Sequence, residues 1–188
     1  MTCASTQGTA MNDMIVNLYH TPSQSIAQEK QAALKKQKIY IQRALPIDKQ
    51  SICEFVRSHF FSICPGWEDE CATSLYRQPT SCFVAIHNRE VIGFACYDGS
   101  AKGVIGPIGV AEPFRKQYIA TVLLHHCLTA MKMEGYAYAV ITCAFSTEFY
   151  QRTCNAHLLP VPEKTPDIYQ RLIHNNPSAP PSHSALIK

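Results

Sequence analysis

The stretch GPIGVAEPFRKQYIATVLL, residues 106–124, is the most informative part of this chain for its fold. A short apolar segment of strand type leads into a basic turn at Arg115 and Lys116, and an amphipathic helix follows. The first turn of a helix carries unpaired N–H groups and the positive end of the helix dipole, which together attract phosphate. The order therefore predicts a phosphate-binding turn, although the turn lacks the glycines that such sites normally use.

Composition limits the classes of protein to which the chain can belong. Its 188 residues suit one globular domain with appendages. The net charge of +3 is too small to predict a nucleic-acid surface. No run approaches the ~18 apolar residues of a membrane span, and no signal-peptide pattern opens the chain, so we expect neither membrane association nor export.

The cysteines predict a reducing, cytoplasmic location. There are nine of them, an odd number, and none forms a C-x-x-C pair, so we expect no metal site. They are expected to act mainly as small buried apolar residues. They lie at Cys3, Cys53, Cys64, Cys71, Cys82, Cys96, Cys127, Cys143 and Cys154.

Three segments are predicted along the chain. Residues 1–37 are interpreted as an N-terminal extension that is disordered or partly helical, with a helix over 23–37. Residues 38–174 form the folded domain. Residues 175–188, which are rich in proline and serine, form a flexible tail.

Within the domain, alternating and helical periodicities predict an α/β (α+β) fold. The hairpin and the later strand-helix-strand order indicate a mixed, mostly antiparallel central sheet of about six strands with helices on both faces. The expected strands are 39–44, 82–86, 91–97, 103–110, 138–142 and 157–160. The expected helices are 48–60, 67–77, 115–134, 146–154 and 167–173.

Four motifs in this order resemble the GNAT superfamily of acyl-CoA N-acyltransferases. They are FVAIHNREVIGFACYD at 83–98, IGPIGVAEPFRK at 105–116, QYIATVLLHHCLTAM at 117–131 and EFYQR at 148–152. The resemblance covers residues 39–173. Within the superfamily, the sequence is similar to a bacterial branch of acetyltransferases whose substrate is unsettled. The resemblance implies acetyl-CoA as the acetyl donor and requires no metal.

The resemblance also assigns the residues that bind acetyl-CoA. Ile108, Gly109 and Val110 match the strand whose backbone contacts the pantetheine arm. The pyrophosphate pattern Q/R-x-x-G-x-G/A falls on Arg115, Lys116, Gln117, Tyr118, Ile119 and Ala120. Tyr118 replaces the first glycine of the pattern. We expect it to adopt helical backbone angles with its ring outward, so that binding is retained; a ring turned inward would weaken binding instead.

Catalytic roles follow from the same resemblance. The backbone N–H of Val110 is the expected donor to the thioester oxygen, and Tyr150 is the expected acid for the leaving thiolate. Glu68 is the candidate base, with Glu70 and Glu112 as alternatives. The acceptor amine is expected to contact Trp67, Tyr97 and Phe145.

We therefore predict an acetyl-CoA-dependent N-acetyltransferase that acetylates a primary amine of a small molecule by direct attack in a ternary complex. One alternative is a catalytically impaired relative that binds CoA or a protein partner. It is motivated by Tyr118, by Cys143 in the place of a family asparagine, and by Asn155 in the place of a family glycine. A protein N-acetyltransferase is a second alternative. Exposed strand ends would allow a homodimer.

Overall fold

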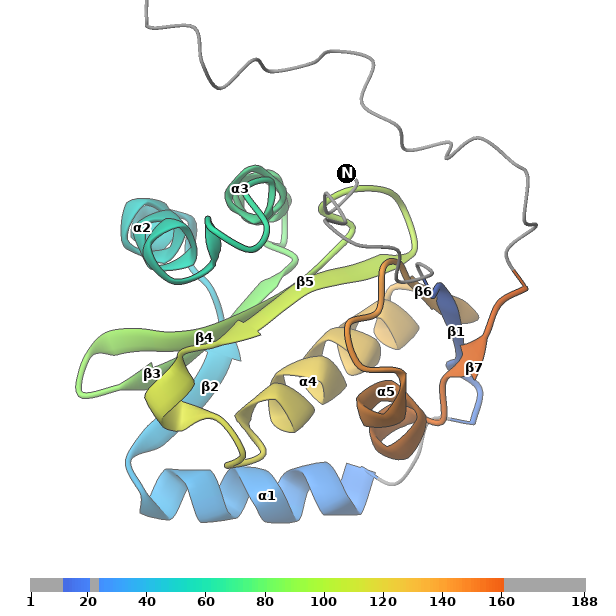
Figure 1. Cartoon of the computed structure of the whole chain (residues 1–188). Coiled ribbons are helices and arrows are strands. Elements are labelled where there is room, and N and C mark those ends of the chain that lie inside the picture. The colour runs from blue at the N-terminus through green and yellow to red at the C-terminus, as the bar shows by residue number, and fades with distance from the viewer. Residues whose placement is uncertain (1–11, 21–23, 161–188) are drawn as a thin grey trace, which may run out of the picture.

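Seven strands form one mixed sheet in the computed structural model, which describes residues 12–20 and 24–160 (Figure 1). The strand order is β2-β3-β4-β5-β6-β1-β7, and β5 and β6 are the parallel pair in an otherwise antiparallel sheet. The mixed, mostly antiparallel sheet predicted from the sequence is confirmed. The strands are β1 (Met14–Asn17), β2 (Ile39–Arg43), β3 (Cys82–His87), β4 (Glu90–Tyr97), β5 (Val104–Val110), β6 (Tyr138–Ile141) and β7 (His157–Leu158).

The helices cover both faces of the sheet, as predicted. Figure 1 shows α2 and α3 on one face and α1, α4 and α5 on the other. A hydrophobic core fills the space between the sheet and each group of helices. The helices are α1 (Gln24–Lys36), α2 (Lys49–Phe60), α3 (Trp67–Leu75), α4 (Ile119–Met133) and α5 (Thr147–Cys154). In the described parts of the chain, no helix has the length and apolar character needed to cross a membrane.

The predicted hairpin joins β3 to β4. His87 pairs with Glu90, which leaves Asn88 and Arg89 as a two-residue loop. Both have positive φ angles, 49° and 69°, as the right-handed twist of a tight hairpin requires. The short polar segment between two apolar runs therefore specified the turn correctly.

The predicted N-terminal boundary at residue 38 is wrong for the part of residues 1–37 that the structure describes. Met14–Asn17 forms β1, which pairs with both β6 and β7 inside the sheet. α1, which confirms the predicted helix apart from its ends, packs against β2 and α4. β1 was missed because four residues carry too little periodicity to be recognised, and it makes the sheet one strand larger than predicted.

The C-terminal elements are tested only in part. The expected last strand is confirmed as the two-residue β7. The predicted helix over 167–173, the domain end at 174 and the tail over 175–188 lie outside the described residues.

Gly109 lets the aromatic side chains under α2 approach β5. A Cβ atom at this position would lie 2.6 Å from Cζ of Phe60 and 2.8 Å from Cε1 of Phe94. Both rings are buried and have little room to move. We expect Gly109→Ala to destabilise the protein by about 1–3 kcal/mol through overpacking, which thermal unfolding would measure.

The partner substitution Phe60→Leu provides the control. The double variant Gly109→Ala/Phe60→Leu should lose less stability than the sum of the losses in the two single variants, because leucine lacks the ring atom that the new methyl group meets. Strict additivity would show that the clash is not the cause.

Candidate functional site

β5 and β6 separate part-way along their length and leave a backbone edge unpaired. The parallel register joins only Val104 to Val140 and Ile105 to Ile141, where β6 ends. β5 continues to Val110 while remaining paired to β4 on its other side. The residues from Gly106 onward therefore have no strand neighbour on the β6 side.

Val110 directs its backbone groups into this gap. Its neighbour Ala111 donates its N–H to the carbonyl of Ile92 at 2.9 Å, on the β4 side. Since N–H directions alternate along an antiparallel strand, the N–H of Val110 points the other way. The carbonyl of Val110 also points away from β4, where it accepts a hydrogen bond from Arg115 Nε at 3.1 Å. Val110 is thus oriented as a donor toward the open edge.

The start of α4 supplies further amide donors. The first hydrogen bond of α4 runs from Val122 N to Tyr118 O at 3.0 Å. The amides of residues 119–121 consequently have no acceptor within the helix. Tyr118 caps the helix without a side-chain hydrogen bond. A helix N-terminus of this kind stabilises a phosphate anion.

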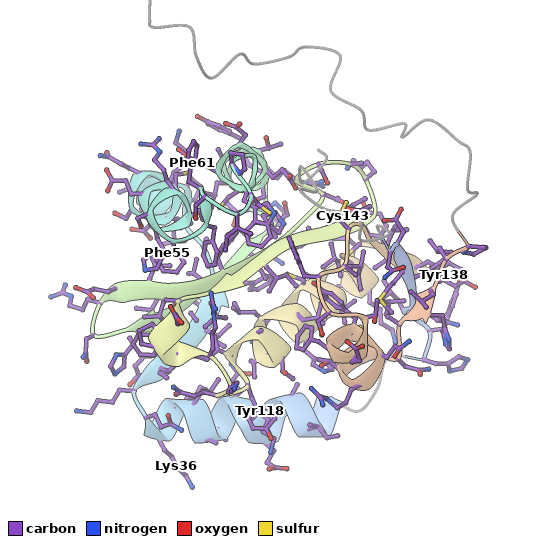
Figure 2. The ribbon with its side chains drawn as sticks, in the orientation of Figure 1. Lys36, Phe55, Phe61, Tyr118, Tyr138 and Cys143 are labelled. Atoms are coloured by element: carbon purple, nitrogen blue, oxygen red, sulfur yellow. The ribbon has the colours of Figure 1, made fainter. Side chains whose placement is uncertain are left out.

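The helical backbone predicted for Tyr118 is wrong. Its φ and ψ angles are 64° and 10°, which place it in the left-handed region that a side chain with Cβ disfavours. The sharp turn from Arg115 into α4 demands this conformation, for which glycine is best suited. The ring is directed outward as expected: it is 56% exposed, and Lys30 of α1 lies 4.6 Å above its centroid. Figure 2 shows Tyr118 between the turn and α1.

A cavity of about 690 Å³ lies against this turn and the start of α4. Three cations line it, Arg115 and Lys116 from the turn and Arg152 from α5. Open amides, a helix N-terminus and several cations together form a site suited to a polyphosphate. The other lining residues are Ile26, Val110, Phe114, Tyr118, Ile119, Ala120, Thr121, His125, Phe149 and Thr153. Gln117, predicted with this group, is not among them.

Replacing Tyr118 by glycine tests the role of the ring. We expect Tyr118→Gly to bind acetyl-CoA at least as tightly as the wild type. The change relieves the left-handed strain and removes a ring at the cavity wall, while the amides stay in place. Isothermal titration calorimetry would measure the affinity, and weaker binding would mean that the ring contributes to the site.

Tyr118→Val is the matched control for strain. A β-branched residue fits the left-handed region worse than tyrosine, so we expect a further loss of stability of about 1–3 kcal/mol. Equal thermal stability of the Val and Gly variants would contradict the strain argument.

α5 packs beside this cavity and carries Tyr150. Burial raises the pKa of the Tyr150 hydroxyl, so the phenol stays protonated at neutral pH. Its hydroxyl donates no hydrogen bond to another described residue, and its ring contacts that of Phe149 with centroids 5.0 Å apart. Tyr150 itself does not line the cavity. Asn155, in the place of a family glycine, follows α5 with left-handed backbone at a φ of 52°, a conformation that asparagine tolerates better than most residues.

Sequence reasoning missed Arg152 and His125 as cavity residues. Phe149, Arg152 and Thr153 follow the i, i+3, i+4 spacing of one helical face, so the arginine could have been found from the spacing. His125 is buried, and burial lowers its pKa, so its ring is neutral at pH 7. His125 lies in the middle of α4, and no sequence pattern indicated that it would face a cavity.

On the opposite face of the sheet, Trp67 and Phe145 lie together. Trp67 begins α3, and its ring centroid is 6.1 Å from that of Phe145 in an edge-to-face arrangement. Phe94 of β4 and Phe60 of α2 lie beneath Trp67, with ring centroids 6.2 and 5.4 Å away. Phe145 is 67% exposed, so these aromatic residues are open to solvent at one side.

The two neighbouring glutamates of α3 lie in different environments. Arg57 donates two hydrogen bonds to Glu68, the one from Nε at 2.7 Å, and this pairing lowers the pKa of Glu68. Burial instead raises the pKa of Glu70 to about 7. Glu70 shares a helical face with Trp67, three residues earlier. The arrangement argues against Glu68 as the base and favours Glu70. Glu112 is exposed in the turn after β5.

The burial of Tyr97 argues against the predicted substrate contact. Its side chain is fully buried. Its hydroxyl donates to Glu134 and accepts from Arg43 at 3.1 Å, while burial raises its pKa to about 12. The alternation along β4 directs it to the α4 face, whereas Phe94 points to the α3 face.

Solved structures of other proteins share this fold. One is the glucosamine N-acetyltransferase region of a fungal multi-domain GH3 β-N-acetylglucosaminidase, at a TM-score of 0.62 and 16% identity over 81% of this chain and 20% of that one. Another is a GCN5-related N-acetyltransferase from Sphaerobacter thermophilus, with a TM-score of 0.58 and 17% identity over 79% of this chain and 48% of that one. A third is a GNAT family acetyltransferase from Brucella melitensis, solved with acetyl-CoA, with a TM-score of 0.50 and 17% identity over 68% of this chain and 91% of that one.

The chain thus spans about a fifth of the length of the first of these proteins and about half of the length of the second. No curated protein matches the sequence. The family model of the acetyltransferase (GNAT) family matches residues 49–156, more than half of the chain, from α2 to the end of α5. The fold around the β5–α4 turn and this match lead to the same assignment: the chain belongs to the GNAT family of acetyltransferases.

Proposed function

We propose that the protein is an acetyl-CoA-dependent N-acetyltransferase that acetylates a primary amine of a small molecule by direct attack in a ternary complex. The observation that carries the proposal is the cavity at the N-terminus of α4. It combines open helix amides with the cations Arg115, Lys116 and Arg152, and it adjoins Val110 on the splayed edge of β5. These groups fit a pyrophosphate followed by an extended polar arm.

The residues of the proposed site divide the binding of the donor between them. The amides of residues 119–121 and the turn from Arg115 to Ala120, including Gln117, would hold the pyrophosphate. The backbone of Ile108, Gly109 and Val110 would pair with the pantetheine arm along the open strand edge. Bound in this way, acetyl-CoA supplies an activated acetyl thioester.

Three groups would then serve the transfer itself. The N–H of Val110 would donate to the thioester oxygen as negative charge develops there, an interaction worth about 2.7–4 kcal/mol in other enzymes. Glu70 would take a proton from the ammonium group of the acceptor. Tyr150 would give its proton to the departing thiolate. Trp67 and Phe145 would form an apolar wall for the acceptor.

Thermal unfolding with acetyl-CoA tests the proposal first. At 100 times its Kd, the donor should stabilise the protein by about 2.7 kcal/mol, which raises Tm by roughly 5–10 °C for a chain of this size. If millimolar acetyl-CoA leaves Tm unchanged, the chain is neither an acetyl-CoA-dependent enzyme nor a CoA-binding module.

Release of CoA across a panel of amines separates the remaining alternatives. Turnover with small primary amines supports the proposal. Turnover with peptide substrates alone would indicate a protein N-acetyltransferase. Binding without turnover would indicate a CoA-binding or protein-interaction module.

A further inference from the structure

Three cysteines that are distant in sequence meet in the core under α2 and α3. Cys71 comes from α3, Cys82 begins β3 and Cys96 lies near the end of β4. Their Sγ atoms all lie within 4.8 Å of one another, and all three side chains are fully buried. Cys82 and Cys96 are register partners, so they point to the same face of the sheet. No sequence spacing indicated this cluster.

Two polar groups border the three thiols. Cys53 of α2 is half-buried and hydrogen-bonds with Cys71, so a fourth thiol lies between the cluster and the surface. Ser74 donates its hydroxyl to Cys96 Sγ at 3.2 Å. These contacts place polar partners beside Cys71 and Cys96 at the border of the cluster.

Ordinary core packing does not account for this convergence. Cys127 and Cys154 are equally buried in the other core, where each fills space without a partner thiol in a described cluster. Apolar filling needs only small side chains, and alanine or valine would serve. Three mutually adjacent sulfurs are instead the donor set that thiophilic metal ions require.

We propose that Cys71, Cys82 and Cys96 bind a thiophilic dication of the Zn²⁺ type, with Cys53 as the fourth ligand. Tetrahedral zinc with bonds of about 2.3 Å to sulfur places its sulfurs ~3.8 Å apart. The three thiols therefore need to approach by about 1 Å at most, within the reach of small side-chain rotations. Each ligand loses its proton to solvent on binding, so affinity rises with pH.

The proposed ion would join four elements of the fold. Its ligands lie on α2, α3, β3 and β4, so the ion would fix both helices onto the sheet. α3 also carries Trp67 and Glu70. Because the ion binds the folded chain, it should raise the stability of the whole domain.

A cobalt titration of the full chain tests the proposal. The protein is purified with a phosphine reductant, stripped with a chelator and titrated with Co²⁺, which absorbs visible light strongly in a tetrahedral thiolate site. We expect saturation at one equivalent, displacement of Co²⁺ by Zn²⁺, and a rise in Tm of roughly 5–10 °C with Zn²⁺ at 100 times its Kd.

Single substitutions then identify the ligands. Cys82→Ala and Cys96→Ala should abolish the absorption, and Cys53→Ser should weaken binding and alter the spectrum. Cys127→Ala, in the other core, should bind one equivalent as the wild type does. A colourless wild-type chain with no Tm response to Zn²⁺ would overturn the proposal, whether or not the variants fold. Equal binding by folded Cys96→Ala and Cys127→Ala proteins would overturn it too.

Discussion

Replacing Tyr150 by phenylalanine is expected to lower kcat by about 100- to 10,000-fold, the range that general acids contribute. The buried hydroxyl has its pKa raised, so it holds a proton at neutral pH and can give it to a departing thiolate. Phenylalanine keeps the ring packed against Phe149 and removes only the proton. Steady-state kinetics with a responsive amine would show the loss in kcat, with the KM for acetyl-CoA changed by less than about 2-fold.

Tyr138→Phe is the matched control for the tyrosine substitution. Tyr138, labelled in Figure 2, is 50% exposed on β6 and does not line the cavity at the start of α4. Its loss of a hydroxyl should leave kcat unchanged. If Tyr150→Phe also retains the wild-type kcat while folding normally, Tyr150 has no part in the chemistry and serves the packing of α5.

Glu70→Gln is expected to lower kcat by a similar factor, about 100- to 10,000-fold, and to change its pH dependence. Burial raises the pKa of Glu70 to about 7, so its carboxylate form becomes available as the pH rises through that value. The wild-type kcat should rise with pH and level off above 7. The kcat of the glutamine variant should lack this rise with pH, which initial rates measured over a pH series would reveal.

Glu68→Gln is the neighbouring control. Arg57 holds the Glu68 carboxylate in an ion pair with a lowered pKa, so removing it should change kcat by less than about 3-fold and leave the pH midpoint in place. The reverse result, a large loss in Glu68→Gln and none in Glu70→Gln, would return the base to Glu68.

The raised pKa of Glu70 also predicts a stability effect that is independent of activity. The ordinary pKa of the group is 4.5, and the folded value is about 7. Between these values the folded protein binds a proton that the unfolded chain does not, so stability falls as pH rises through 7. Glu70→Gln should remove that decline, which thermal unfolding at several pH values would detect.

Local sequence patterns were sufficient for most of the fold. The long apolar stripe of α4 and the alternation of β3 and β4 around Asn88 and Arg89 each describe an element that its neighbours along the chain complete. β1 could not be found in this way. Its four residues become a strand only because β6 and β7 offer backbone partners on both sides.

The candidate site was predictable to a similar extent. The turn at Arg115 and the start of α4 were located from the residues themselves. The left-handed backbone of Tyr118 was not, because the path from β5 into α4 imposes it against the preference of the side chain. The burial of Tyr97 depended on which face of β4 each core covers, which the alternation alone does not specify.

The sequence by itself determined the family, the order of elements and the position of the turn proposed to bind the donor, since these depend on contiguous residues and their spacing. Only the tertiary structure decided how distant side chains meet. It joined Arg57 to Glu68, left Glu70 partly buried, brought Arg152 to the cavity and assembled Cys71, Cys82 and Cys96 from three elements. Such contacts depend on how sheet and helices pack, and burial and pairing then set the charge and reactivity of each group.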